Sequence, residues 1–134
     1  MASSLYDNYR AEALQGLRTP GSETVKVFAV SNAYTFSAAH TAVNDVTAAM
    51  RMHTSVALSS KTFTAGVFDA ADLTLTAASS ASAINALSLY TEAGSSASST
   101  LMVYIDTGTG FPVTTNGGNI IVQWDGGANK IYKL

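Results

Sequence analysis

The last third of the chain, residues 101–134, alternates short apolar runs with turns rich in glycine. The runs at 101–105 and 120–124 are separated by two glycine pairs and a proline. Short apolar runs bounded by Gly, Asn and Asp are typical of antiparallel strands joined by tight turns. Residues 130–134 are again partly apolar, so a last strand is expected to reach Leu134.

Earlier segments carry the same pattern. Residues 23–31 are apolar on both faces, which predicts a central strand. Short strands are expected at 61–64 and 66–69, with a turn at Ala65 and Gly66 between them. Further strands are predicted at 73–77, 84–92, 101–105 and 120–124, with a flexible Gly/Ser connection at 94–99. About eight short strands favour an antiparallel β-sandwich or a jelly-roll-like fold.

Residues 49–59 alternate between apolar and polar side chains, which predicts a half-buried strand. The residues expected to point inward are Met50, Met52, Thr54, Val56 and Leu58. Those expected to point outward are Arg51, His53 and Ser55. The exposed pair Arg51 and His53 is therefore one candidate contact region for a partner.

Residues 3–17 predict one short N-terminal amphipathic helix, capped by Ser3 or Ser4 and ended by Gly16. At about 100° per residue, one arc collects the apolar side chains. These are Leu5, Tyr6, Tyr9, Ala13 and Leu17. Such a stripe packs on its own sheet or docks on a neighbour, so Leu5, Tyr6 and Tyr9 form a second candidate contact region. Residues 1–134 are thus expected to form a single domain, helical within 1–17 and β-rich over 23–134.

The composition suits a protein that works inside an assembly. Hydrophobic residues make up 47% of the 134 residues and charged residues only 12%, against about 25% charged residues in ordinary soluble domains. A homo-oligomer, or another assembly that covers part of the surface, explains this shortage. A Ser/Thr/Ala-rich surface that stays soluble without charge is the alternative.

Charge and cysteine content exclude several classes of function. Seven Lys and Arg stand against nine Asp and Glu, and the formal net charge is −2. No basic stripe is present to neutralise phosphates, so nucleic-acid binding is not expected. The chain has no cysteine, which excludes disulfides, a thiol nucleophile and Cys-based zinc sites. No secretory signal or membrane span is recognisable, and synthesis in a host cytoplasm is the expectation.

One motif has the appearance of a catalytic site. Asp106, Thr107 and Gly108 follow an apolar strand, as in aspartic proteases, where two such aspartates share a proton. Thr109 and a second glycine follow at once, however, and no downstream apolar-apolar-glycine partner segment is present. Asp and Gly are also favoured turn residues. A turn is therefore the preferred interpretation, and the protein is expected not to be an enzyme.

Other candidate sites are weaker. His40 and His53 are the only histidines, with Asn44 and Asp45 as neighbours, and a metal site needs three or four converging ligands. Asp69 and Asp72 fit a strand turn better than a calcium site. Trp124 with Tyr104 and Tyr132 could form a sugar-binding surface, although core or interface packing is favoured. No metal or cofactor is expected.

Several segments resemble one protein family. In the C-terminal third these are YIDTGTGFPVT (104–114), NGGN (116–119), VQWD (122–125) and NKIYKL (129–134). Upstream, LYDN (5–8), VKVF (25–28), GVFDA (66–70) and LTL (73–75) stand in the same order as in that family. Together they are similar to small virion structural proteins of tailed bacteriophages.

This resemblance implies a non-enzymatic virion protein of the head decoration or cement group. Such a protein would bind the major capsid protein and stabilise the assembled shell. A tail or head–tail interface component is the alternative, and a carbohydrate-binding receptor module or an Asp-Thr-Gly protease is more distant. The expected location is the virion.

Overall fold

The computed structural model describes residues 4–52, 55–76 and 83–134. Strands take up 36% of the structure and helices 11%, which confirms a mainly β fold with antiparallel sheets. The elements are β1 (Ser4–Leu5), α1 (Asp7–Leu14), β2 (Val25–Ser31), β3 (Val56–Ala57), β4 (Thr62–Thr64), β5 (Val67–Asp69), β6 (Leu73–Leu75), β7 (Ala83–Thr91), β8 (Thr100–Ile105), β9 (Val113–Thr114), β10 (Ile120–Val122) and β11 (Tyr132–Lys133), with short 3₁₀ turns η1 (Val43–Asp45) and η2 (Ala48–Met50).

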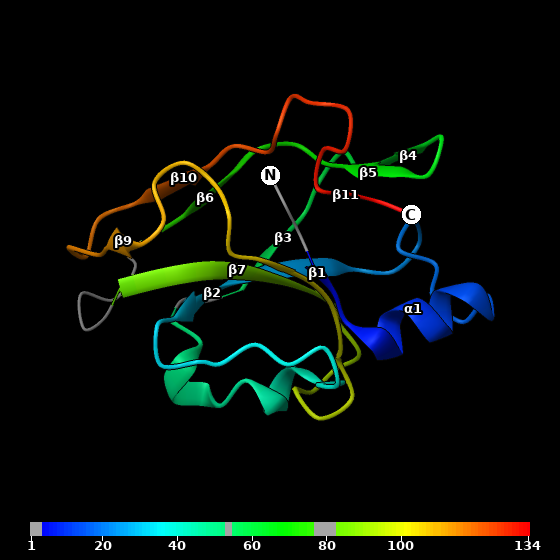
Figure 1. Ribbon diagram of the computed structural model, residues 1–134, viewed down its shortest axis with the longest axis horizontal. Coiled ribbons are helices and arrows are strands. Elements are labelled where there is room, and N and C mark those ends of the chain that lie inside the picture. The colour runs from blue at the N-terminus through cyan, green and yellow to red at the C-terminus, as the bar shows by residue number, and fades with distance from the viewer. Residues whose placement is uncertain (1–3, 53–54, 77–82) are drawn as a thin grey trace.

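The main sheet forms the middle of the molecule (Figure 1). Its strand order is β1-β8-β7-β2-β3, and β9 adds to one end of β7. All six residues of β8 are buried, and so are most residues of β2 and β7. Burial on both faces requires cover above and below the sheet, which explains why these strands lack a polar face. The central strand predicted at 23–31 is therefore confirmed, and so are the strands predicted at 84–92 and 101–105.

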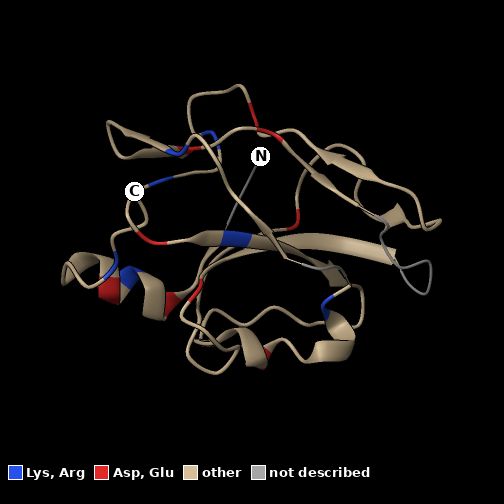
Figure 2. Cartoon of the chain, turned by 180° about the vertical axis from the view of Figure 1, so that it is seen from behind, with Lys and Arg blue, Asp and Glu red and all other residues tan. Residues whose placement is uncertain are grey.

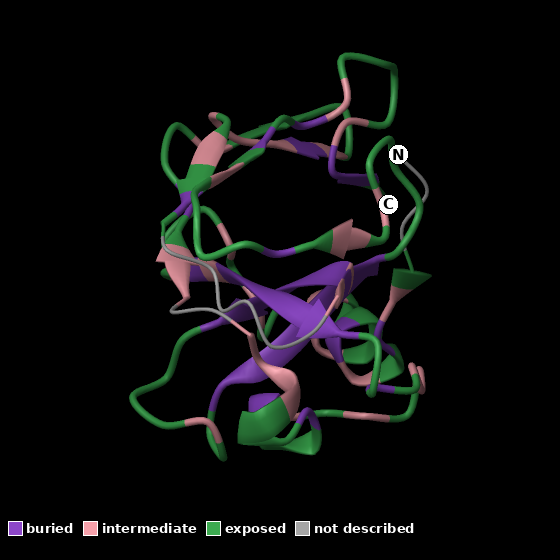
Figure 3. Cartoon of the chain, turned by 90° about the vertical axis from the view of Figure 1, so that its left-hand side faces the viewer, coloured by how far each residue is buried: buried purple, intermediate pink, exposed green. Residues whose placement is uncertain are grey.

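Two small sheets cover one face of the main sheet, and an irregular layer covers the other. One small sheet pairs β10 with β6, and the second has the order β11-β5-β4. In Figure 1 both lie above the main sheet, while the segment with η1 and η2 lies below it. Figure 3 shows the buried residues concentrated in the middle layer, with exposed residues outside. The arrangement is β-sandwich-like, as the strand pattern predicts.

The β4–β5 hairpin turns where the sequence predicts it. Thr64 pairs with Val67, so the loop contains only Ala65 and Gly66. Both have positive φ angles, 54° and 77°. Two-residue loops with positive φ at both positions match the right-handed twist of the flanking strands. Leu134 donates its backbone N–H to the Gly66 carbonyl at 2.9 Å, so the last residues of the sequence lie against this turn.

The N-terminal helix is shorter than the predicted segment 3–17. Ser4 and Leu5 form β1 instead, which pairs with Tyr104 and Val103 of β8. Tyr6, rather than a serine, precedes the helix as its N-cap, and its N–H donates to the Met102 carbonyl at 3.0 Å. The edge of the main sheet satisfies these backbone groups, so the helix begins only at Asp7. Gly16 lies just beyond the helix with φ 73°, as its predicted role as a terminator requires.

The strand predicted at 49–59 is wrong for most of its length. Residues 48–50 form a 3₁₀ turn, Arg51 makes an isolated bridge with Val30, and only Val56–Ala57 is a strand. The preceding turns bury Val43 and Val46 beneath the main sheet. The chain therefore has to cross from the lower layer to the edge of β2, where the two residues of β3 pair with it. His53 and Thr54 lie outside the described residues.

Candidate functional site

The predicted contact stripe on the N-terminal segment is mostly core. Tyr6 is 0% exposed and Tyr9 is 1% exposed, whereas Leu5 is half-buried. Burial raises the pKa of both tyrosines. The Tyr6 hydroxyl lies 3.4 Å from that of Tyr34, and the Tyr9 hydroxyl lies 2.7 Å from that of Tyr132. The expectation that Tyr6 and Tyr9 contact a partner is corrected: their side chains join the helix to its own domain.

The predicted Arg51 and His53 face is also different in the structure. Arg51 is half-buried, its backbone is bridged to Val30, and its Nε is buried without a hydrogen-bond partner among the described residues. A half-buried guanidinium is not a freely exposed contact, because 49–59 does not run as a regular strand with one polar face. His53 falls outside the described residues.

The outward side of α1 carries an apolar residue that the stripe did not include. Leu14 is 90% exposed. On a helical wheel it stands about 80° from Tyr6 and about 60° from Leu17, just outside the arc of the predicted stripe. The buried tyrosines fix the helix with this leucine toward solvent. Because Leu14 lies next to the predicted stripe, the helical pattern alone did not show that it would be exposed.

Leu14 belongs to a larger apolar patch, here called the end surface and made of Leu5, Ala13, Leu14, Phe63 and Leu134. Leu134 is 66% exposed and Phe63 is 44% exposed. A groove of about 460 Å³ lies between α1 and the last residues of the chain. A second groove of about 220 Å³ lies between α1 and the β4–β5 hairpin. Ala13 and Leu134 line both grooves, so the two adjoin.

Segments far apart in the sequence build the end surface. In Figure 1, α1, the hairpin β4–β5 and the C-terminal end of the chain lie together at one end of the long axis. Residues of β11 pair with β5, which places Leu134 beside the hairpin. The ring of Phe63 stacks on Phe68 with centroids 4.9 Å apart. These contacts hold exposed apolar side chains on rigid elements, a property of protein interaction sites.

Two cations flank the larger groove. Arg10 and Lys133 both line it. Arg10 makes only a long, exposed ion pair of 3.9 Å with Asp7, and Lys133 forms no ion pair within the described residues. By contrast, Arg18 is engaged by Glu12 and Glu23. The larger groove is therefore apolar inside with two cationic side chains at its rim, and the Asp7 carboxylate lies beside one of them.

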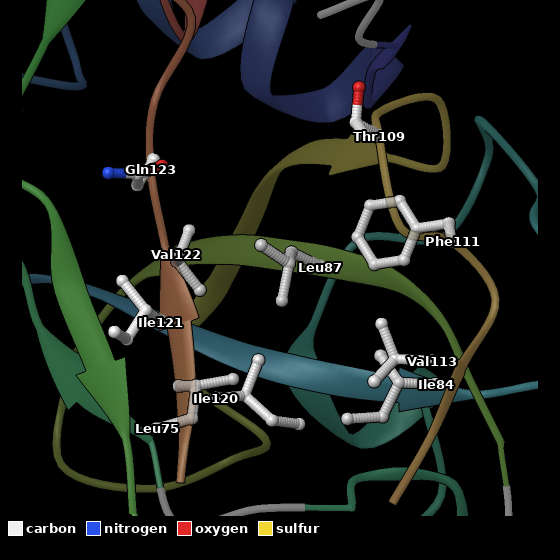
Figure 4. Close-up of a pocket in the computed structure, with 10 residues that line it drawn as sticks. All are labelled: Leu75, Ile84, Leu87, Thr109, Phe111, Val113, Ile120, Ile121, Val122 and Gln123. Carbon is white, nitrogen blue, oxygen red and sulfur yellow. The ribbon is translucent and has the colours of Figure 1, made fainter.

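An apolar cavity lies elsewhere, between β7 and the β6–β10 sheet (Figure 4). Its volume is about 90 Å³. The lining residues are Leu75, Ile84, Leu87, Thr109, Phe111, Val113, Ile120, Ile121, Val122 and Gln123. Except for Thr109 and Gln123 all are apolar, so the cavity offers no group for acid–base chemistry.

The residues of the protease-like motif do not form a catalytic arrangement within the described chain. Asp106 and the residues to Gly110 are exposed and follow the end of β8. Within the described residues, no hydrogen bond or ion pair joins Asp106 to a histidine or to a second carboxylate. The motif is thus an exposed loop, as the turn interpretation predicts.

The weaker candidates also have structural explanations. The Nδ1 atom of His40 lies 2.7 Å from the Tyr34 hydroxyl. Asp69 pairs with Lys130 at 3.7 Å, and Asp72 accepts a hydrogen bond from the Trp124 N–H at 2.9 Å. Across the described ranges, no group of three or more His, Cys, Asp or Glu residues is arranged to hold a metal ion.

The proposed aromatic sugar-binding surface is not present at the surface. Trp124 is 8% exposed, and its indole N–H donates to the Ala71 carbonyl at 3.1 Å. Tyr104 and Tyr132 are also buried. All three rings are buried in the core, which confirms the favoured packing interpretation over a sugar-stacking surface.

The charged residues form no single-signed surface. Figure 2 shows Lys and Arg near α1 and the C-terminal segment, interleaved with Asp and Glu. Lys26 pairs with Glu92 at 2.7 Å on the main sheet. Within the described part of the chain, no helix has the length and apolar content needed to cross a membrane.

Comparisons with known proteins identify no relative of this chain. No protein-family model matches this chain, and no curated protein matches it closely enough to count as a relative.

Proposed function

We propose that this protein is a non-enzymatic virion structural protein of a tailed bacteriophage, most simply a capsid decoration or cement protein that binds the major capsid shell. It acts as a homo-oligomer, needs no cofactor, and binds neither nucleic acid nor membrane. The resemblance of segments along most of the chain supports the virion role. A tail or head–tail interface component remains the second candidate.

One structural observation carries the proposal: the end surface is apolar, exposed and rigidly built. Leu14, 90% exposed, and Leu134, 66% exposed, line the same groove, and contiguous exposed apolar patches mark interaction sites. Burial of apolar surface is favourable by about 25 cal/mol per Å². A protein with such a patch is stabilised when a neighbouring subunit covers it, as happens in a shell.

Multivalency makes this arrangement effective. Many copies on a symmetric lattice combine weak individual contacts into strong overall binding. Binding to the assembled shell, and not to its free subunits, stabilises the shell by linkage. A decoration protein of this kind needs contact surfaces rather than a reaction site.

Particle composition tests the proposal. Purified phage particles are expected to contain this protein after density-gradient banding, with hundreds of copies per particle for a decoration role. About a dozen copies or fewer would indicate the tail or head–tail junction instead. Particles lacking the protein should lose their genome at lower temperature, and adding the purified protein should restore the original stability. Absence of the protein from banded particles would refute the virion role.

A further inference from the structure

We infer that the end surface is occupied by a second copy of this chain, which inserts the region around Ile121 in a head-to-tail contact. The inference rests on the proposed function in one respect, namely that the end surface is covered in an assembly. It adds the identity of the partner and the orientation of the contact.

Outside the end surface, Ile121 is a large aliphatic residue that is exposed on a strand. It is 71% exposed in β10. Ile121 borders the cavity together with Ile120 and Val122, but unlike them it is mostly exposed, as is its cross-strand partner Thr74. In Figure 4 its side chain lies on the side of β10 that faces away from Leu87 and Phe111. Ile121 is thus an aliphatic side chain fixed on a paired strand.

The two apolar features lie at different ends of the molecule. In Figure 1, β10 lies toward one end of the long axis, and α1 with the C-terminal residues lies at the other. The groove of about 460 Å³ between α1 and Leu134 is large enough to admit a branched aliphatic side chain. One copy can therefore offer Ile121 while its own groove receives the next copy.

Charge supports this orientation. Asp72 immediately precedes β6 and is exposed; its Oδ1 accepts the Trp124 backbone N–H, and it forms no ion pair within the described residues. The Ile121 region thus has the chemistry that the groove accepts, an aliphatic side chain with a carboxylate beside it. In the head-to-tail contact Asp72 approaches the rim formed by Arg10 and Lys133.

A symmetric contact between two end surfaces is less favourable. A two-fold axis through the end surface would bring the same patch of each copy together. Arg10 and Lys133 of one copy would then approach the same cations of the other. Heterologous contacts instead join unlike patches and generate rings or rows, which suits a protein placed on a symmetric particle.

A complementation experiment tests the inference. Leu14→Asp removes the groove, and Ile121→Asp removes the inserted side chain. Both residues are exposed, so the fold should persist, and circular dichroism melts would verify this. In sedimentation velocity at up to about 1 mM protein, the unaltered chain should self-associate and each variant should be monomeric. An equimolar mixture should form a dimer and nothing larger, because one intact groove meets one intact Ile121.

Control variants sharpen the result. Ala49→Asp adds the same charge at an exposed position in η2, which lies on the opposite side of the main sheet from β10 (Figure 1), and should associate like the unaltered chain. Asp72→Lys should weaken association by about threefold to tenfold. Tighter association by Asp72→Lys would contradict the orientation.

Other outcomes overturn the inference. An unaltered chain that stays monomeric would refute it, and so would variants that associate normally or a mixture that forms no dimer. Should Leu14→Asp abolish particle incorporation while the unaltered chain is monomeric, the occupant is another virion protein. The particle-composition experiment is independent of this one, so failure of the virion role and failure of self-association are distinguishable.

Discussion

The hydroxyls of Tyr9 and Tyr132 lie 2.7 Å apart in a buried hydrogen bond that joins residues 123 positions apart in the sequence. Their rings meet edge to face, with centroids 6.2 Å apart. Burial raises the pKa of each hydroxyl above its ordinary value. The bond fixes α1 against β11, and so it fixes the two elements that border the larger groove of the end surface.

Replacing one of these tyrosines should destabilise the fold. Tyr132→Phe leaves the Tyr9 hydroxyl buried without its partner, which is expected to lower the free energy of unfolding by about 1–2 kcal/mol. The double variant Tyr9→Phe, Tyr132→Phe should lose less than the sum of the two single variants. Urea denaturation measures all three. Tyr90→Phe is the control, since Tyr90 is buried but its hydroxyl makes no hydrogen bond within the described residues. Additive losses would disprove the coupling.

Substitutions at the two positions of the β4–β5 turn should change the stability of the protein in opposite directions. Ala65 has φ 54°, which an L-residue with a Cβ adopts at some cost, so Ala65→Asn should stabilise the protein by up to about 1 kcal/mol. Gly66 has φ 77°, and a Cβ there would lie 3.1 Å from the Leu134 carbonyl oxygen. Gly66→Ala should therefore destabilise by about 1 kcal/mol or more. Thermal melts of both variants would check this, and equal signs would contradict the turn geometry.

Asp45 should make part of the stability dependent on pH. The N–H groups of Thr41 and Ala42 donate to its carboxylate at 2.8 and 3.0 Å, and these hydrogen bonds lower the pKa of Asp45. A lowered pKa in the folded state means that the stabilisation is present above the ordinary value of 3.8 and lost as the pH falls through the lowered pKa.

The variant Asp45→Asn tests this dependence. At pH 7 it should lower the Tm by about 2–5 °C. As the pH falls below 3.8 and through the lowered pKa, the difference in Tm should shrink, because Asp45 then becomes protonated in the folded state as well. A difference in Tm that stays constant as the pH falls would show that the charge of Asp45 contributes nothing.

Asp106→Asn tests the absence of protease chemistry. Asp106 is exposed and lies in the loop after β8, so this substitution should change the Tm by less than about 2 °C. Particle incorporation should also be unchanged. Incubation of the unaltered protein with unfolded casein, followed by gel electrophoresis, is expected to show no cleavage. Cleavage that Asp106→Asn abolishes would establish the aspartic-protease alternative.

The cavity between β7 and the β6–β10 sheet should accept one more methylene group. Val122 lines this cavity of about 90 Å³. Val122→Ile should stabilise the fold by about 0.5–1 kcal/mol, because it buries an additional CH₂ in space already present. Urea denaturation measures the change, and Val103→Ile in the filled core of β8 serves as the control, expected to be destabilising through overpacking.

Local sequence patterns determined most of the strands. The apolar runs that became β2, β7 and β8 carry their own signal, since a strand buried on both faces is apolar on both faces. The turn at Ala65 and Gly66 is also local, because its two residues alone must supply the positive φ angles. The tertiary structure was needed elsewhere. The pattern around Leu5 predicts a helix, but Leu5 pairs with β8 instead. The pattern of 49–59 predicts a strand, but burial of the preceding turns in the lower layer limits its pairing with β2.

The candidate site was decided by tertiary structure alone. The sequence by itself determined which side chains are apolar. Tyr9 is buried and Leu14 is exposed because the contact of Tyr9 with Tyr132 fixes the orientation of the helix. Likewise, Phe63 and Leu134 share a surface only because β11 pairs with β5. Periodicity along a chain reports which residues share a face of one element. Which face meets solvent depends on contacts between residues far apart in the sequence, and these form only when the layers pack.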